Sequence, residues 1–218
     1  MDLNYKLITG PVVEPITRAF VKAHSRIEID DEDPQVDLYI RAARERAENA
    51  ECWIQLVGAT WELRLDAFPS CGPILLPRPP LIEMISIKYV DTDGALQTLS
   101  DSSVSPAVTS SVFTVDEKSP THPEPGEIHL AYGKSWPSTR AEHNAVRVRY
   151  RAGFAEASGS PPETPDPSAF LCNGVLQWIA IAAATSYADR ESRIVGTIVA
   201  NLDFIDHLLD PWRATRSV

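Results

Sequence analysis

The spacing of apolar residues changes twice along this chain of 218 residues, and no other feature limits its fold as much. Apolar residues recur every three or four positions over residues 34–50 and again over residues 170–189, as on the buried face of a helix. Between these segments they alternate with polar residues, as in a half-buried strand. This order predicts an α+β fold: a helical body formed by N-terminal helices and long C-terminal helices, with an inserted small antiparallel β-sheet lobe.

The changes of period divide the chain into three parts. Residues 1–56 are the N-terminal helical part, with an irregular start, a short helix capped by Thr17, and a helix that begins with Asp33 as N-cap and Pro34. Residues 57–157 are the antiparallel β lobe with long loops, and residues 158–218 are the C-terminal helical part. We expect the two helical parts to pack together.

A proline-rich segment marks the β lobe. Pro77, Pro79 and Pro80 fix φ and remove backbone donors, so they form an extended edge before the strand at residues 85–90. The Asp-Thr-Asp-Gly sequence at residues 91–94 then supplies a turn. Other strands are expected at residues 61–65, 128–132 and 146–150 and, more weakly, near residues 96 and 113; residues 100–111 and 118–126 are expected to be loops.

Composition excludes several classes of protein. A net charge of −10 argues against a chain that wraps nucleic acid, because that task requires clustered Lys and Arg. The three cysteines lie far apart without Cys-x-x-Cys spacing, so neither a disulfide framework nor a zinc site is expected. The first residues lack the pattern of a signal peptide. Polar residues interrupt residues 170–189, which favours a buried helix over a membrane span.

Motifs that suggest ligand chemistry fail on their spacing. The Gly-Lys-Ser at residues 133–135 lacks the earlier glycine of a phosphate loop, since Ile128 stands there. Residues 91–94 resemble the opening of a calcium loop, but its twelfth position is Ser102, where a glutamate is required. The acidic run at residues 30–33 is expected at a helix start without any ion, because the helix dipole favours carboxylates there.

The histidines give no catalytic arrangement by spacing. His122 and His129, with Glu124 and Glu127 between them, are the best metal constellation, although a solvated loop leading into a strand explains them better. An enzyme would require two of His122, His129, Asp116 and Glu127 to meet around a cavity. We therefore predict no catalytic residue, no metal and no cofactor.

Three arginines, Arg147, Arg149 and Arg151, share one face of a predicted strand. Their guanidinium groups repel one another unless carboxylates or another subunit face them. One interpretation is an exposed face paired with Glu62 or Asp66 on a neighbouring strand. The other is a contact between subunits, which makes the three arginines a candidate subunit interface.

An ordered series of motifs runs from about residue 14 to about residue 191. It includes Glu-Pro-Ile-Thr at residues 14–17, Ala-Ala-Arg-Glu-Arg at 42–46, Leu-Pro-Arg-Pro-Pro-Leu at 76–81 and Val-Arg-Val-Arg-Tyr-Arg-Ala-Gly-Phe at 146–154. The series resembles the head-tail connector (adaptor) proteins of long-tailed phages, prophages and gene transfer agents. Two positions depart from that pattern: Phe20 stands where a capping glutamate is common, and Arg151 where a small polar residue is usual.

The resemblance implies a structural virion protein of the neck that is assembled in the cytoplasm of a host bacterium and is neither an enzyme nor a membrane protein. Such adaptors form a ring, usually of twelve subunits, which binds the portal, extends the DNA channel and provides a platform for a stopper or other neck protein. Genomic DNA would pass an acidic wall without sequence-specific binding. A closed ring requires heterologous interfaces.

The C-terminal segment, residues 201–218, is the candidate for portal docking, because an amphipathic stripe with a cationic tail suits a groove. A neck stopper or tail-completion protein is an alternative function. A monomeric binding module or a metal-dependent enzyme is a more distant one. The candidate docking residues are Leu202, Ile205, Leu209, Trp212, Arg213 and Arg216.

Overall fold

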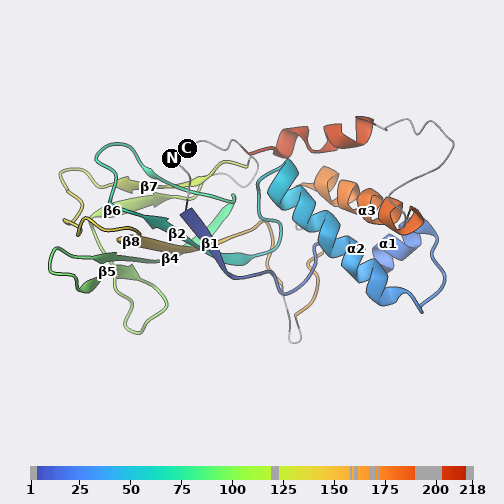
Figure 1. Cartoon of the computed structure of the whole chain (residues 1–218), viewed down its shortest axis with the longest axis horizontal. Helices are drawn as coiled ribbons and strands as arrows, with labels where there is room; N and C mark the ends of the chain where they lie inside the picture. The colour runs from blue at the N-terminus through green and yellow to red at the C-terminus, as the bar shows by residue number, and fades with distance from the viewer. Residues whose placement is uncertain are drawn as a thin grey trace.

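Two β-sheets lie at one end of the molecule and the helices lie at the other (Figure 1). The structure is a computed structural model, and it describes residues 4–118, 123–157, 159, 162–166, 170, 172–189 and 203–214. The elements, in chain order, are β1 (Asn4–Thr9), α1 (Arg18–Ser25), α2 (Asp33–Arg46), the π-helical turn η1 (Ala47–Glu51), β2 (Ala59–Leu65), β3 (Ile74–Leu76), β4 (Leu81–Val90), β5 (Leu96–Asp101), β6 (Phe113–Asp116), β7 (Gly126–Leu130), β8 (Val146–Ala152), α3 (Asn173–Ala188) and the 3-10 turns η3 (Asp203–Leu208) and η4 (Asp210–Trp212).

The two N-terminal helices begin near the predicted residues. Thr17 caps α1, since its hydroxyl oxygen accepts a hydrogen bond from the Phe20 N–H at 3.1 Å. The N-cap of α2 is Glu32 and not Asp33 as predicted. The Asp33 carboxylate is instead engaged by Lys22 of α1, whose Nζ lies 2.7 Å from Asp33 Oδ1.

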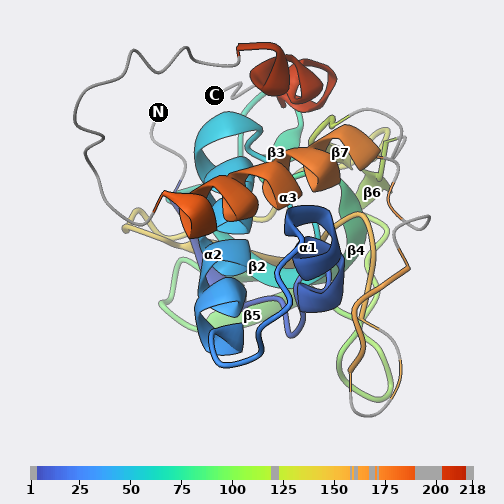
Figure 2. The same cartoon turned by 90° about the vertical axis from the view of Figure 1, so that its right-hand side faces the viewer.

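One hydrophobic core joins the helices. It contains Val21 of α1, Ile40 of α2 and Ile179 of α3, all at most 1% exposed. Figure 2 shows α3 crossing α2 with α1 beside them. The expectation of long C-terminal helices is corrected: the described residues after residue 172 form one long helix, α3, followed by η3 and η4. Pro211 lacks a backbone donor, so a regular helix is not continued there.

Two antiparallel sheets replace the one expected. A five-stranded sheet has the order β1-β2-β8-β4-β5, and a three-stranded sheet has the order β3-β7-β6. Strand β1, where an irregular start was expected, pairs with β2, so the N-terminal part contributes to the sheet as well as to the helices. Its adjacent residues Leu7 and Ile8 are both exposed, and they break the alternation that would have indicated a strand.

A second core fills the space between the two sheets. Ile87 of β4, Ile128 of β7 and Tyr150 of β8 are completely buried in it. The Tyr150 hydroxyl donates a hydrogen bond to the Pro77 carbonyl at 2.8 Å, which ties β8 to the proline-rich segment. The predicted turn at residues 91–94 is present between β4 and β5, and the Asp91 carboxylate accepts hydrogen bonds from the backbone of Asp93 and Ala95.

Candidate interaction surfaces

The three predicted arginines lie on the outer face of the central strand of the five-stranded sheet. Val146, Val148, Tyr150 and Ala152 of β8 point into the core, so the residues between them point outward. The register places these arginines opposite outward residues of β2 on one side and of β4 on the other.

Two of the three arginines have carboxylate partners within the chain. Arg149 Nη2 lies 3.0 Å from Glu62 Oε2, and Arg151 Nη2 lies 2.8 Å from Glu156 Oε1. Asp66, the other partner considered from the sequence, lies beside His143 instead, with 2.8 Å between Asp66 Oδ1 and His143 Nδ1. The expected pairing with Glu62 therefore holds for Arg149, whereas Arg151 pairs with Glu156, a partner that the sequence did not indicate.

Glu62 is the buried anion beneath this face. Its side chain is 7% exposed and receives hydrogen bonds from both Arg149 and Arg64. Burial alone would raise the pKa of Glu62, but the hydrogen bonds and positive charges of Arg149 and Arg64 together outweigh burial and lower it. Glu62 therefore stays ionised and holds two guanidinium groups.

Arg147 differs from its two neighbours. Its backbone partners are Arg64 on β2 and Lys88 on β4, so two cations flank it directly. Lys88 pairs with Asp101, with 2.9 Å between Nζ and Oδ2. Arg147 is exposed and makes no ion pair with any residue that the structure describes.

The candidate docking segment lies against the helices. Leu209 is completely buried, while Ile205 and Trp212 pack against the helical core. The Trp178 indole N–H donates a hydrogen bond to Asp206 at 3.0 Å. The apolar stripe thus fixes the segment to its own chain, whereas Arg213 remains 48% exposed at its side chain. Leu202 and Arg216 lie outside the described residues.

Three of the residues considered for a metal site meet in space. Asp116, Glu127 and His129 place one ligand atom each within 4.8 Å of one another. Lys118 lies among them, with its Nζ 2.9 Å from Asp116 and 3.3 Å from Glu127. Lys118 donates hydrogen bonds to Asp116 and Glu127, which raises the pKa of Lys118, so its ammonium group balances the carboxylates. His122 lies outside the described residues.

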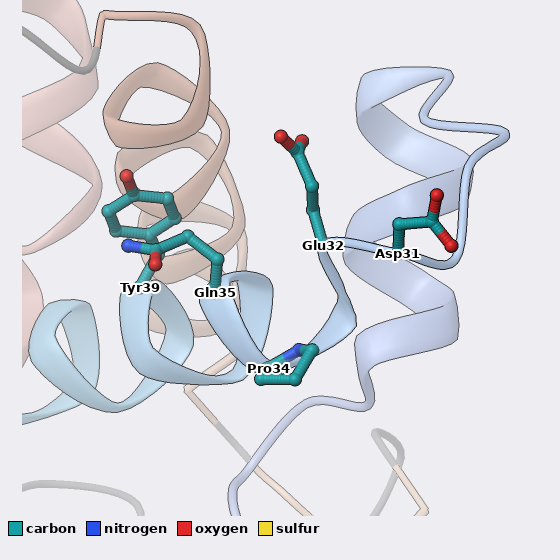
Figure 3. Close-up of a pocket in the computed structure, with 5 residues that line it drawn as sticks. All are labelled: Asp31, Glu32, Pro34, Gln35 and Tyr39. Carbon is teal, nitrogen blue, oxygen red and sulfur yellow. The ribbon is translucent and has the colours of Figure 1, made fainter.

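One surface hollow at the start of α2 shows no catalytic arrangement among its described lining residues. It is open, has a volume of about 410 Å³, and is lined by Asp31, Glu32, Pro34, Gln35 and Tyr39. Figure 3 shows that Gln35 and Tyr39 come from α2, while Asp31 and Glu32 come from the connection that precedes it. The Glu32 carboxylate accepts a hydrogen bond from the Tyr187 hydroxyl of α3, so this residue fastens the helices together.

A buried cation that the sequence did not single out connects the sheet to the helices. Arg78, of the Leu-Pro-Arg-Pro-Pro-Leu motif, is 6% exposed, and its Nη1 donates to the Glu48 carbonyl of η1 at 2.7 Å. Its guanidinium carbon lies 5.5 Å from the Tyr5 ring centre, 5.9 Å from Trp53 and 5.3 Å from Trp61. In the sequence, Arg78 simply stands between two prolines. The aromatic residues around it in the structure are far away in sequence, so no local pattern indicates that they surround this arginine.

No helix in the described part of the chain has both the length and the apolar character needed to cross a membrane. No protein-family model matches the sequence, and no curated protein matches it either. The fold, however, is shared with solved structures of gene transfer agent (GTA) particles.

A chain from the virion of the native GTA particle has a TM-score of 0.71 and 19% sequence identity, over 100% of this chain and 98% of that one. A chain from the neck of the empty particle, computed with C6 symmetry, has a TM-score of 0.72 and 19% identity, over 99% and 97%. A chain from the neck of the native particle, computed with C12 symmetry, has a TM-score of 0.62 and 19% identity, over 100% and 98%. The class defined by these observations is that of α+β chains with the fold found in GTA necks.

Proposed function

We propose that this protein is a structural component of the neck of a phage-like particle and acts as the head-tail adaptor. The observation that carries the proposal is the shared fold over nearly the whole length of both chains, including chains from particle necks. A single domain of a common fold can occur in proteins of many functions. Here the similarity extends over the full length of the chains, so it includes the sheets, the helices and their arrangement. The ordered motifs of the connector family support the same role.

A ring of twelve subunits beneath the portal is the proposed assembly. The C12 symmetry applied to one of the similar necks supports this number. Repeated subunits in a closed ring contact one another through two different surfaces, so each copy must carry both. The strongly acidic chain suits a DNA channel, because phosphates gain nothing from a wall rich in carboxylates.

The C-terminal segment remains the proposed portal-docking element, through the exposed Arg213 and through Arg216, which lies outside the described residues. Truncation would be a poor test, because it removes Leu209 and Trp212 from the helical core. The charge-reversal variant Arg213→Glu with Arg216→Glu is a sharper one. With the residues that the structure describes, Arg213 makes only long ion pairs, at 3.6 Å and 4.0 Å, so its loss costs the fold little.

We expect this double variant to keep the melting temperature of the wild type and to bind the portal protein at least tenfold more weakly. Arg140→Glu, on an exposed loop beyond the sheets, is the matched control for the change of charge. Affinity can be measured by surface-immobilised portal binding at two salt concentrations. Unchanged affinity of the double variant would remove the C-terminal segment from the docking proposal.

Light scattering with and without the portal protein tests the adaptor role as a whole. An adaptor forms a complex with the portal ring alone, whereas a stopper requires an adaptor to be present first. No catalytic activity belongs to this proposal, because the similar chains are parts of virions and necks.

A further inference from the structure

The outer face of the five-stranded sheet is positively charged on a strongly acidic chain. Its strands present six cations and three carboxylates, a net charge of +3 on a chain whose net charge is −10, which leaves −13 on the rest of the molecule. The cations are Lys6, Arg64, Lys88, Arg147, Arg149 and Arg151, and the carboxylates are Glu62, Glu83 and Asp101.

At the centre of this face, positive charges lie side by side, and the described carboxylates of the same chain do not neutralise all of them. Arg64, Arg147 and Lys88 stand directly opposite one another on β2, β8 and β4, and we name these three residues the cationic row. Like charges in directly opposite positions on neighbouring strands destabilise a sheet. The carboxylates beneath the row are already used, because Glu62 holds Arg64 and Arg149 while Asp101 holds Lys88.

From this arrangement we infer that Arg147, at the centre of the cationic row, binds a carboxylate of a neighbouring copy of this chain. The inference rests on the ring assembly proposed above. It specifies which residue on one of the two contact surfaces of each subunit binds the neighbouring subunit. An exposed guanidinium without an ion pair can form two parallel hydrogen bonds with one carboxylate. The excess of acidic groups on the remaining surface supplies that carboxylate from an identical subunit, as a heterologous contact requires.

Nucleic acid is a less suitable partner for the same face. DNA affinity grows with the number of phosphates that are neutralised, and it requires several cations free to take part. Four of the six cations on this face, Arg64, Lys88, Arg149 and Arg151, are held by carboxylates of the same chain. Those carboxylates would also repel phosphates that approach the sheet.

Zero-length coupling tests the inference at residue 147. The variant Arg147→Lys places an amine at the centre of the row, and a carbodiimide joins an amine only to a carboxylate in direct contact. The full-length variant is mixed with ¹⁵N-labelled copies of itself in the presence of the portal protein, and coupled peptides are identified by mass spectrometry. We expect peptides that join residue 147 of one isotope to an Asp or Glu of the other isotope.

The inference would be overturned if residue 147 formed no coupled peptide, or if it coupled only to carboxylates of the same isotope. Arg147→Glu provides the functional readout, and we expect it to weaken association between subunits at least tenfold. Lys134→Glu, an exposed lysine in the connection after β7, makes the same change of charge away from the row and should have no such effect. Equal ring assembly by the Arg147→Glu variant and the wild type would also overturn the inference.

The behaviour of the wild type on the portal separates this inference from the proposed function. If the wild type forms a ring on the portal and Arg147→Glu forms it equally well, only the role of the row fails. If the wild type forms no ring on the portal, the adaptor proposal itself fails. The wild type could instead bind a short DNA duplex in a salt-dependent manner, lose this binding in Arg147→Glu, and show no coupling between isotopes. This result would refute the inference and identify nucleic acid as the partner of the row.

Discussion

Removal of the Arg78 side chain should destabilise the whole protein, because this residue connects the two ends of the molecule. Its guanidinium donates to the Glu48 carbonyl at 2.7 Å and to the Tyr5 hydroxyl at 3.2 Å. Hydrogen bonds from a charged donor contribute about 1.5–3 kcal/mol each, and a desolvated cation over an aromatic ring contributes about 0.5–2 kcal/mol. The cost of burying the guanidinium offsets a large part of this sum.

We therefore expect Arg78→Ala to lower the free energy of unfolding by about 3–5 kcal/mol, a large share of the roughly 5–15 kcal/mol of a typical domain. For a chain of this size the melting temperature should fall by about 8–15 °C, at about 2–4 °C per kcal/mol. Urea unfolding followed by circular dichroism, together with calorimetry, measures both quantities.

The backbone at this position supplies a matched control. Arg78 has a φ of 63°, in the left-handed region. An alanine at this position is strained in the same way as the arginine, whereas a glycine is not strained. Arg78→Gly should therefore lose about 1 kcal/mol less than Arg78→Ala. An unfolding free energy of Arg78→Ala within 1 kcal/mol of the wild type would refute the account of Arg78 as a stabilising cation.

Two other predictions concern the sheets. Gly153→Ala should lower the free energy of unfolding, measured with a chemical denaturant, by about 2–4 kcal/mol, because a Cβ there would lie 2.7 Å from the Gly58 nitrogen and φ is 151°. A loss below about 1 kcal/mol would contradict the close approach of these backbones. Hydrogen bonds from Ser103 and then Lys88 lower the pKa of Asp101 from 3.8 to about 2, so its ionised form stabilises the fold above pH 3.8 and this contribution is lost as the pH falls through 2. Asp101→Asn should thus flatten the dependence of unfolding free energy on pH between 4 and 2, and an unchanged acid limb in urea titrations would oppose this assignment.

The parts of the fold with strong local signals could be predicted from the sequence. The Thr17 cap, the helix after Pro34 and the alternating strands around Leu63 and Val148 all depend on periodicity or on a side chain close to its partner in sequence. The division of the strands into two sheets could not be predicted. It depends on pairing between distant segments, such as β3 with β7, and alternation does not identify the partner strand.

The candidate surfaces show the same limit. The outward direction of Arg147, Arg149 and Arg151 followed from a period of two. Pairing of this face with Glu62 or Asp66 was one of two interpretations, and the structure shows that Arg149 is the arginine that meets Glu62. Which arginine makes no ion pair with a described residue depended on register, because only the three-dimensional pairing places Arg64 and Lys88 on either side of Arg147. The burial of Leu209 in the helical core required tertiary structure in the same way.

We propose that this chain is a neck adaptor that assembles as a ring on the portal. The most direct test is the light-scattering mass of the complex formed by the purified chain with the portal protein of the same particle. We expect a stable complex whose mass corresponds to the portal ring plus one full ring of this chain, about twelve copies by the resemblance to known adaptors. A chain that stays monomeric at micromolar concentration and leaves the mass of the portal unchanged would contradict it.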